Sequence, residues 1–247
     1  MSEQDIKPEA ISPPSDGQSN LGDSLQGILS VEQQKADHER AKIDQLDAKY
    51  PEAERHHVGA ILGVEVVVCG SEPNPEHIRI LEQGMQTLEK RFGREIIEKA
   101  FSSVTAYLVA DASVVGGGQA LPREDAVILS SEHMGMLVGD MEELASSRGM
   151  YRKGDQSEVF GADSDASEIG FVHELGHILE YRAHGDMGLG FASIDHDSAP
   201  TWYGQAKGAH EDYAESWMFL AYGHAINGSR EAILRDDLDL VASQKHD

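Results

Sequence analysis

Five consecutive residues, His173 to His177, read HELGH and constrain this chain more than any other segment. In an α-helix, residues four positions apart are separated by about 400° of turn, so His173 and His177 emerge from nearly the same face. Two imidazole nitrogens are thereby offered to one zinc ion. Glu174 lies on the same side, where its carboxylate can reach a metal-bound water. The spacing predicts two metal ligands and a general base within little more than one helical turn.

The residues around this motif predict the helix that it needs. Asp165 to Glu168 has the form of a capping box, and Gly185 offers a C-terminal stop. Between them, apolar residues at helical spacing form one face, made by Phe171, Val172, Leu175, Ile178 and Leu179. His173 and His177 fall on a second face. The alternative is an exposed helix that carries two histidines by chance. The apolar face indicates a helix packed on a core, which favours the interpretation of the two histidines as metal ligands.

A later segment, His210 to Trp217, offers carboxylates for a third ligand. Glu211 and Glu215 are one helical turn apart on a helix expected over 210–220. With Glu211 as the third protein ligand, water takes the fourth position, as in catalytic zinc sites, and Glu215 accepts a hydrogen bond from a ligand histidine. A solvent-facing acidic helix is the alternative. Cys69 is the only cysteine, which excludes a site built on a cysteine pair.

The spacing also excludes one common zinc-peptidase pattern. The metzincin pattern continues H-E-x-x-H with x-x-G-x-x-H, whereas Glu180 and Ala183 stand at the two defining positions here. His184 is one position out of register, and both His184 and His196 are expected at the surface. The third ligand must therefore come from elsewhere, as Glu211 would.

Together, HELGH and the later E-D-Y-A-E-S-W segment resemble the gluzincin zinc metallopeptidases, in particular the catalytic domain of the anthrax toxin lethal factor type and the Pro-Pro endopeptidases. Those proteins carry H-E-x-G-H and then an E-x-x-A-E-aromatic helix, and the resemblance covers roughly residues 100–222. It implies Glu211 as zinc ligand, Glu215 as its support and Tyr203, in a Tyr-Gly pair, as oxyanion donor. It also implies an α+β, zincin-like fold, with a small mixed sheet with an edge strand, the HExxH helix and a following Glu-bearing helix.

Zincin-like folds place an edge strand just before the active-site helix, where substrate can bind through main-chain hydrogen bonds. Residues 126–130 are expected as that strand, with a plain core strand as the equal alternative. Other elements expected from hydrophobic periodicity are strands over 60–69 and 104–110 and helices over 75–92, 94–101 and 133–146. Gly116 to Gly118 is expected to be a flexible loop. The long polar loops 147–164 and 185–208 are expected to line the cleft, the first as a lid.

Composition divides the chain in two. Residues 1–57 are expected to be a disordered acidic tail with a helix over 31–50, and residues 58–247 to be the zincin-like catalytic domain. The pair His56-His57 is interpreted as a linker, because adjacent side chains diverge on a helix or a strand. Residues 236–247 are interpreted as a polar acidic tail.

The formal net charge of −24, from 44 acidic and 20 basic residues, argues against partners such as nucleic acid and anionic membrane surfaces. No stretch approaches the ~18–20 apolar residues of a membrane span. The N-terminus, MSEQDIKPEA, lacks the basic and apolar regions of a cleavable signal peptide. The expected location is the cytoplasm, or outside the cell after export by a non-Sec route. Nothing in the sequence indicates an oligomeric state.

These features predict a zinc-dependent endopeptidase that acts on a peptide or protein substrate, with Glu174 as general base. The expected Zn²⁺ ligands are His173, His177 and Glu211. Two alternatives stay open. One is a zinc-binding pseudoenzyme or protein-interaction module, in which His196 or His210 adds a fourth ligand. The other is an exported toxin or effector peptidase, which differs in destination more than in chemistry.

Overall fold

The computed structural model describes residues 19–111, 118–147, 152, 154 and 156–244. The disorder expected for residues 1–18 and the flexible loop expected at 116–117 lie outside these residues.

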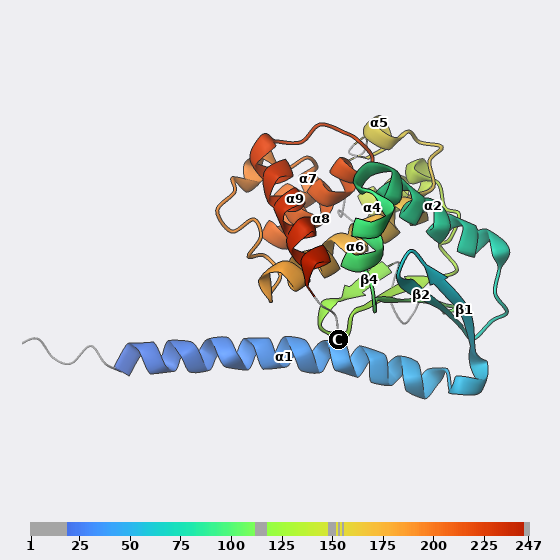
Figure 1. Ribbon diagram of the computed structural model, residues 1–247, viewed down its shortest axis with the longest axis horizontal. Helices are drawn as coiled ribbons and strands as arrows, with labels where there is room; N and C mark the ends of the chain where they lie inside the picture. The colour runs from blue at the N-terminus through green and yellow to red at the C-terminus, as the bar shows by residue number, and fades with distance from the viewer. Residues whose placement is uncertain (1–18, 112–117, 148–151, 153, 155, 245–247) are drawn as a thin grey trace, which may run out of the picture.

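One mixed sheet of five strands organises the fold (Figure 1). Its strands, in spatial order, are β1 (Arg55–Ile61), β2 (Val64–Cys69), β3 (Thr105–Val109), β5 (Ala126–Ser130) and β4 (Gly118–Leu121). The three central strands, β2, β3 and β5, are parallel, and an antiparallel strand closes each edge. The α+β class expected from the sequence is confirmed.

Both faces of the sheet are covered, because its central strands are apolar on both sides. In β2, Val64, Val66 and Val68 enter the main hydrophobic core, whereas Val67 and Cys69 belong to a second cluster on the opposite face. This alternation follows from the two-residue repeat of a strand. A strand buried on both faces reads as a continuous apolar run, which is why these segments could be recognised in the sequence.

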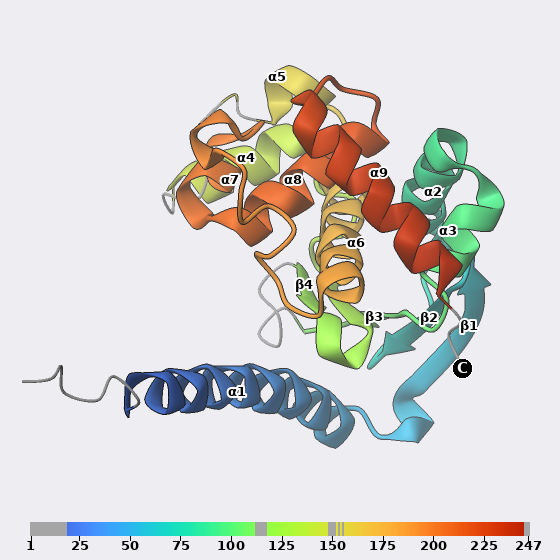
Figure 2. The same cartoon turned by 60° about the vertical axis from the view of Figure 1, so that its left-hand side comes forward.

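The helices form a thick layer on one face of the sheet and a single long helix on the other (Figure 2). The thick layer contains α2 (Pro75–Phe92), α3 (Arg94–Ala100), α4 (Val138–Ser147), α5 (Ser157–Phe160), α6 (Ala166–His184), α7 (Trp202–Lys207), α8 (Ala209–Ala221) and α9 (Gly228–Ser243). Short 3-10 turns occupy Glu52–Glu54, Pro122–Glu124 and His196–Ser198. Helix α6, which carries HELGH, packs against the sheet, α2, α8 and α9.

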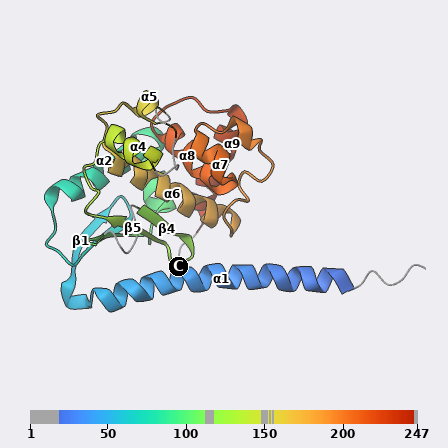
Figure 3. The same cartoon turned by 180° about the vertical axis from the view of Figure 1, so that it is seen from behind.

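The single helix on the other face is α1 (Ser19–Lys49), and its last turns lie next to the sheet (Figure 3). Leu46 is fully buried and packs with Tyr50 against the sheet. Glu39 accepts hydrogen bonds from the backbone N–H and the guanidinium of Arg123, both at 2.8 Å, just beyond the end of β4. The helix expected over 31–50 therefore begins earlier, at Ser19, and its last turns belong to a core of the folded domain.

Two expected elements at the start of the domain are wrong. The strand expected over 60–69 is a hairpin of β1 and β2. Leu62 and Gly63 form its turn with φ of +47° and +92°, as a two-residue type I′ turn requires. Leucine rarely adopts a positive φ, so an apolar run that contains Leu62 does not indicate a turn. His56 and His57 lie within β1 and are not a linker.

The edge strand near HELGH is also not the expected one. Residues 126–130 form β5, which lies inside the sheet between β3 and β4, so the core-strand alternative is correct. The edge is β4, which begins at Gly118, in a segment whose glycines predicted a loop. At the C-terminus, the expected polar tail is largely part of α9, where Asp237, Leu238 and Val241 are buried.

Other expected elements are confirmed. Helix α2 spans the predicted residues, and the side chain of Asn74 caps it by accepting from the N–H of Glu76. The helix expected over 133–146 begins later, at Val138. Within the described part of the chain, none of the helices combines the length and apolar character that crossing a membrane requires.

Candidate metal centre

Helix α6 is fixed at both ends by the residues that the sequence indicated. The Asp165 carboxylate accepts hydrogen bonds from the backbone N–H groups of Ser167 and Glu168, at 2.8 and 3.1 Å. Gly185 ends the helix in the left-handed conformation, with φ of +75°. The capping box is only half formed, because the Glu168 carboxylate accepts instead from the hydroxyl of Tyr222 at 2.9 Å.

The glycine inside HELGH lets the two ligand-bearing helices approach each other. A Cβ on Gly176 would lie 3.0 Å from both the Cα of Ala214 and the Cδ1 of Trp217 on α8. Such contacts are closer than packed carbon atoms tolerate. The small residues at 176 and 214 therefore bring the start of α8, with Glu211, opposite the histidines of α6.

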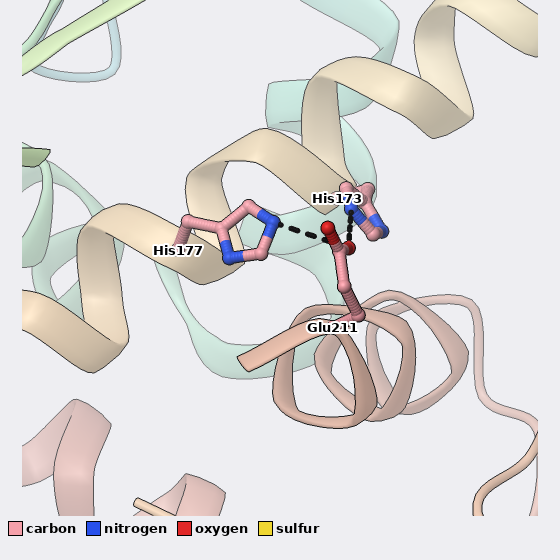
Figure 4. Close-up of side chains that lie close together, drawn as sticks. All are labelled: His173, His177 and Glu211. Carbon is pink, nitrogen blue, oxygen red and sulfur yellow. Dashed lines mark ion pairs between the residues drawn. The ribbon is translucent and has the colours of Figure 1, made fainter. Parts of the chain in front are cut away.

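His173, His177 and Glu211 converge from these two helices (Figure 4). The Oε2 atom of Glu211 lies 3.2 Å from Nε2 of His173 and 3.5 Å from Nε2 of His177. One ligand atom from each residue lies within 4.8 Å of the other two. All three side chains are largely buried, so these atoms face one another with little access to solvent.

Charge and hydrogen bonding in this cluster fit a divalent cation. Burial raises the pKa of Glu211, but the two histidines outweigh it and hold this pKa well below its usual range. Burial lowers the pKa of His173, but Glu211 and Glu215 outweigh it and raise this pKa well above its usual range. Oε2 of Glu211 is buried and accepts no hydrogen bond from the described residues. Two imidazoles and one carboxylate are a donor set that zinc uses in catalytic sites.

Glu215 supports the first histidine. It is fully buried one turn along α8, and its Oε1 lies 3.1 Å from Nδ1 of His173. The imidazole thus turns Nε2 toward Glu211 and Nδ1 toward Glu215. A carboxylate on the second nitrogen fixes the ring and its tautomer, as is common for histidines that bind metals.

The group of side chains His173, His177 and Glu211 is called the metal cluster below. Glu174 lies between this group and the edge of the sheet. Its Oε2 accepts a hydrogen bond of 2.7 Å from the backbone N–H of Ala120 in β4. A Cβ on Gly118 would lie 3.3 Å from Oε1 of Glu174, so the absence of a side chain at 118 leaves room for this carboxylate beside β4. Because the N–H of Ala120 points away from β5, its carbonyl points to the same free edge.

Tyr203 reaches the cluster from α7. Its hydroxyl donates a hydrogen bond of 3.2 Å to Oε1 of Glu211. Burial and the neighbouring carboxylates raise the pKa of Tyr203, so the phenol keeps its proton. A Cβ on Gly204 would lie 3.1 Å from the Cα of Asp212, which explains why a glycine follows the tyrosine where α7 meets α8.

Sequence reasoning missed a buried ion pair and two histidine–aspartate contacts that hold α6 and α8 in place. Asp212, fully buried on α8, lies 2.7 Å from the Arg230 guanidinium and 2.9 Å from Nδ1 of His196. His184 lies 2.9 Å from Asp237. Both histidines, expected at the surface, are half-buried and engaged with aspartates. Asp212 stands in an otherwise largely apolar segment, and a buried carboxylate needs a partner, so this residue could have indicated the contacts.

Among the described residues, His210 is a further histidine that lies beside His177 and Glu211. Its Nε2 lies 3.6 Å from Oε1 of Glu211, its ring centroid lies 5.9 Å from that of His177, and burial lowers its pKa. His196, the other candidate for a fourth ligand, is engaged with Asp212 instead. The metal-ligand group found among the described residues contains His173, His177 and Glu211. Comparisons with protein-family models, curated proteins and solved structures found no match for this chain.

Proposed function

We propose that this protein is a zinc-dependent endopeptidase with a zincin-like catalytic domain of the gluzincin type. The observation that carries the proposal is the convergence of His173, His177 and Glu211 beside a carboxylate, Glu174, that contacts a sheet edge. Three protein ligands leave a coordination position for water, which separates a catalytic site from a closed structural one.

Zinc held by these three residues would supply a Lewis acid that lowers the pKa of water from 15.7 to about 7. The Glu174 carboxylate would take the proton of the attacking water and deliver it to the amine that leaves. The Tyr203 hydroxyl, which stays protonated, would donate a hydrogen bond to the carbonyl oxygen as negative charge develops there. Glu215 would keep the His173 ring in its binding orientation.

A peptide substrate is favoured by the free edge of β4. An extended peptide can pair with the backbone groups of a sheet edge and so acquire a fixed register. Ala120 already uses its N–H with Glu174, so a bound peptide on this edge would run beside the proposed base. The resemblance of HELGH and the Glu211–Trp217 segment to gluzincin peptidases supports the same reaction.

The decisive test compares the wild type with Glu174→Gln, both loaded with zinc. Because an amide oxygen can still accept from the N–H of Ala120, we expect this variant to fold and to bind one zinc ion. Digestion of a diverse peptide library, analysed by mass spectrometry, should yield cleavage by the wild type alone. Loss of a general base lowers the rate by about 10²–10⁴-fold.

Two results would count against the proposal. Equal cleavage by Glu174→Gln would remove the general-base role. Stoichiometric zinc without cleavage by the wild type would favour the zinc-binding pseudoenzyme or interaction module.

A further inference from the structure

A cavity of about 510 Å³ begins at His173 and Glu174 and extends away from the metal cluster. Figure 2 shows α4 and α5 toward one end of α6 and β4 toward the other. The cavity reaches from one end of α6 to the other, because both Gly118 of β4 and Gln156 beside α5 line it. A substrate that lies along β4 would therefore have this cavity beside it.

Most of the cavity wall is apolar and adaptable. Its apolar side chains are Leu129, Met134, Met136, Met141, Leu144, Ile169 and Met218. Methionine is unbranched and polarisable, so such a wall can adjust around a flexible aliphatic chain. The wall thus fits the stem of a long side chain better than one rigid ring.

The end beside α5 is polar and lacks partners. Gln156 is only 3% exposed, and its Oε1 accepts no hydrogen bond from any described residue. Nδ1 of His133, which also lines the cavity, is buried without a partner in the described part of the chain. Buried polar atoms without partners are rare and costly, which indicates that a bound group satisfies them.

The backbone that presents Gln156 is held firmly. Glu142 of α4 accepts hydrogen bonds from the backbone N–H groups of Gly154, Gln156 and Ser157, at 3.0, 2.6 and 3.2 Å. The Ser157 hydroxyl adds a fourth bond, at 2.6 Å. The Glu142 carboxylate is thus fully engaged, and it anchors the residue whose amide faces the cavity.

None of the described side chains that line the cavity at the α5 end is a carboxylate, a lysine or an arginine. The carboxylates that line the cavity are Glu174 and Glu215, and both belong to the metal end, against Ala120 and His173. A substrate ammonium or carboxylate at the α5 end would have no countercharge among the lining residues, and burying it would be costly. A neutral amide, which both donates and accepts, can pair with the side-chain amide of Gln156, whose Oε1 has no partner among the described residues.

We propose that this cavity binds a substrate side chain with an aliphatic stem and a neutral amide end, as in glutamine. Its amide pairs with Gln156 and reaches His133, and its stem lies along the methionines. The inference rests on the proposed function only in that the cavity opens beside the proposed catalytic residues.

The test measures binding, so that it does not depend on cleavage. Acetyl-Ala-Ala-Gly-Xaa-Ala-Ala-amide peptides, with Xaa as Gln, Met or Glu, are titrated calorimetrically into zinc-loaded Glu174→Gln protein. Met matches the length of Gln without its hydrogen bonds, and Glu adds a charge. The Gln peptide is expected to bind about tenfold more tightly than either, since each buried polar partner would otherwise go unpaired.

The same titrations in a Glu174→Gln, Gln156→Met double variant should abolish the preference for Gln over Met. Met fits the apolar wall, and the backbone N–H of residue 156 still donates to Glu142. The control is Glu158→Gln in the same background, a change on the exposed side of α5 that should keep the preference.

Equal affinity for the Gln and Met peptides, a preference that survives Gln156→Met, or no binding of any peptide would overturn this inference. The result is separable from the proposed function. Selective binding of the Gln peptide, with no cleavage of library peptides by the zinc-loaded wild type, would retain the inference and reject the peptidase. Cleavage of library peptides by the wild type, without preferential binding of the Gln peptide, would retain the peptidase and reject the inference.

Discussion

Glu180, three residues after His177, is a fully buried carboxylate with an incomplete set of partners. Its Oε1 accepts from the N–H of Gly190 at 3.2 Å, while Oε2 has no partner in the described part of the chain. Burial raises the pKa of Glu180 from 4.5 to about 7. A carboxyl whose folded pKa is raised destabilises the fold as pH rises, because the unfolded chain releases the proton first.

The penalty is absent below pH 4.5, grows through the window from 4.5 to 7 and is then constant at roughly 3 kcal/mol. Glu180→Gln keeps an acceptor for Gly190 and carries no charge. We therefore expect it to stabilise the metal-free protein at pH 8 by up to about 3 kcal/mol and to have little effect near pH 4.5. Urea denaturation of wild type and variant at both pH values measures this difference. A pH-independent gain would instead indicate a packing effect.

Residue types alone were sufficient to place His173, Glu174 and His177 on one capped helix, because helical periodicity and two capping residues are local signals. The convergence of Glu211 on them depends on the close approach of α6 and α8. Gly176 and Ala214 permit that approach, but their partners cannot be deduced from spacing. The hydrogen bonds from the backbone around Gln156 to Glu142 of α4 could not be predicted, because they join segments that share no sequence pattern.

At the scale of elements, α1 behaves as part of the domain. Leu46 is fully buried between this helix and the sheet, and its cluster includes Leu121 at the end of β4. Leu46→Ala should lower the free energy of unfolding by about 2–5 kcal/mol, the usual cost of a buried leucine. Denaturant titration followed by circular dichroism checks this value.

Val31→Ala is the matched control, because Val31 lies on the same helix and is 50% exposed. Its effect should stay within about 0.5 kcal/mol. Equal effects of the two substitutions would show that α1 does not dock on the sheet in solution.

Elements with long periodic patterns and caps, such as α2 and α6, could be predicted nearly to the residue. Those that failed were short or carried misleading residues. The β1–β2 turn places a leucine at positive φ, and β4 begins at a glycine that lies close to Glu174. The packing of α1 on the sheet could not be predicted, since a helix with so few apolar residues can equally be a marginal helix that contacts nothing.

For the whole molecule, the metal cluster joins two helices that both belong to the main core. Ligand binding to the folded state alone stabilises it, by about 2.7 kcal/mol when zinc is at 100 times its dissociation constant. For a chain of this length, that corresponds to a rise in Tm of about 5–10 °C. Scanning calorimetry with zinc and with a chelator measures the shift.

Glu211→Ala is the control, since it removes one proposed ligand. Its Tm should respond little to zinc, and a shift as large as that of the wild type would reject Glu211 as a ligand. Global properties of this kind were only partly predictable. The acidic composition and the α+β class follow from the sequence, whereas the burial of Asp212 with Arg230 depends on how the C-terminal helices return to the core.

The geometry of α1 has a consequence for distance. A helix of 31 residues is about 46 Å long, and the residues that contact Arg123 and the sheet lie from Glu32 to its C-terminal end. Its first turns project past the rest of the molecule (Figure 1, Figure 3). Because these turns are helical, a fluorophore attached near Ser19 would report a narrower range of separations from a metal ion bound at His173, His177 and Glu211 than one attached through a flexible tether.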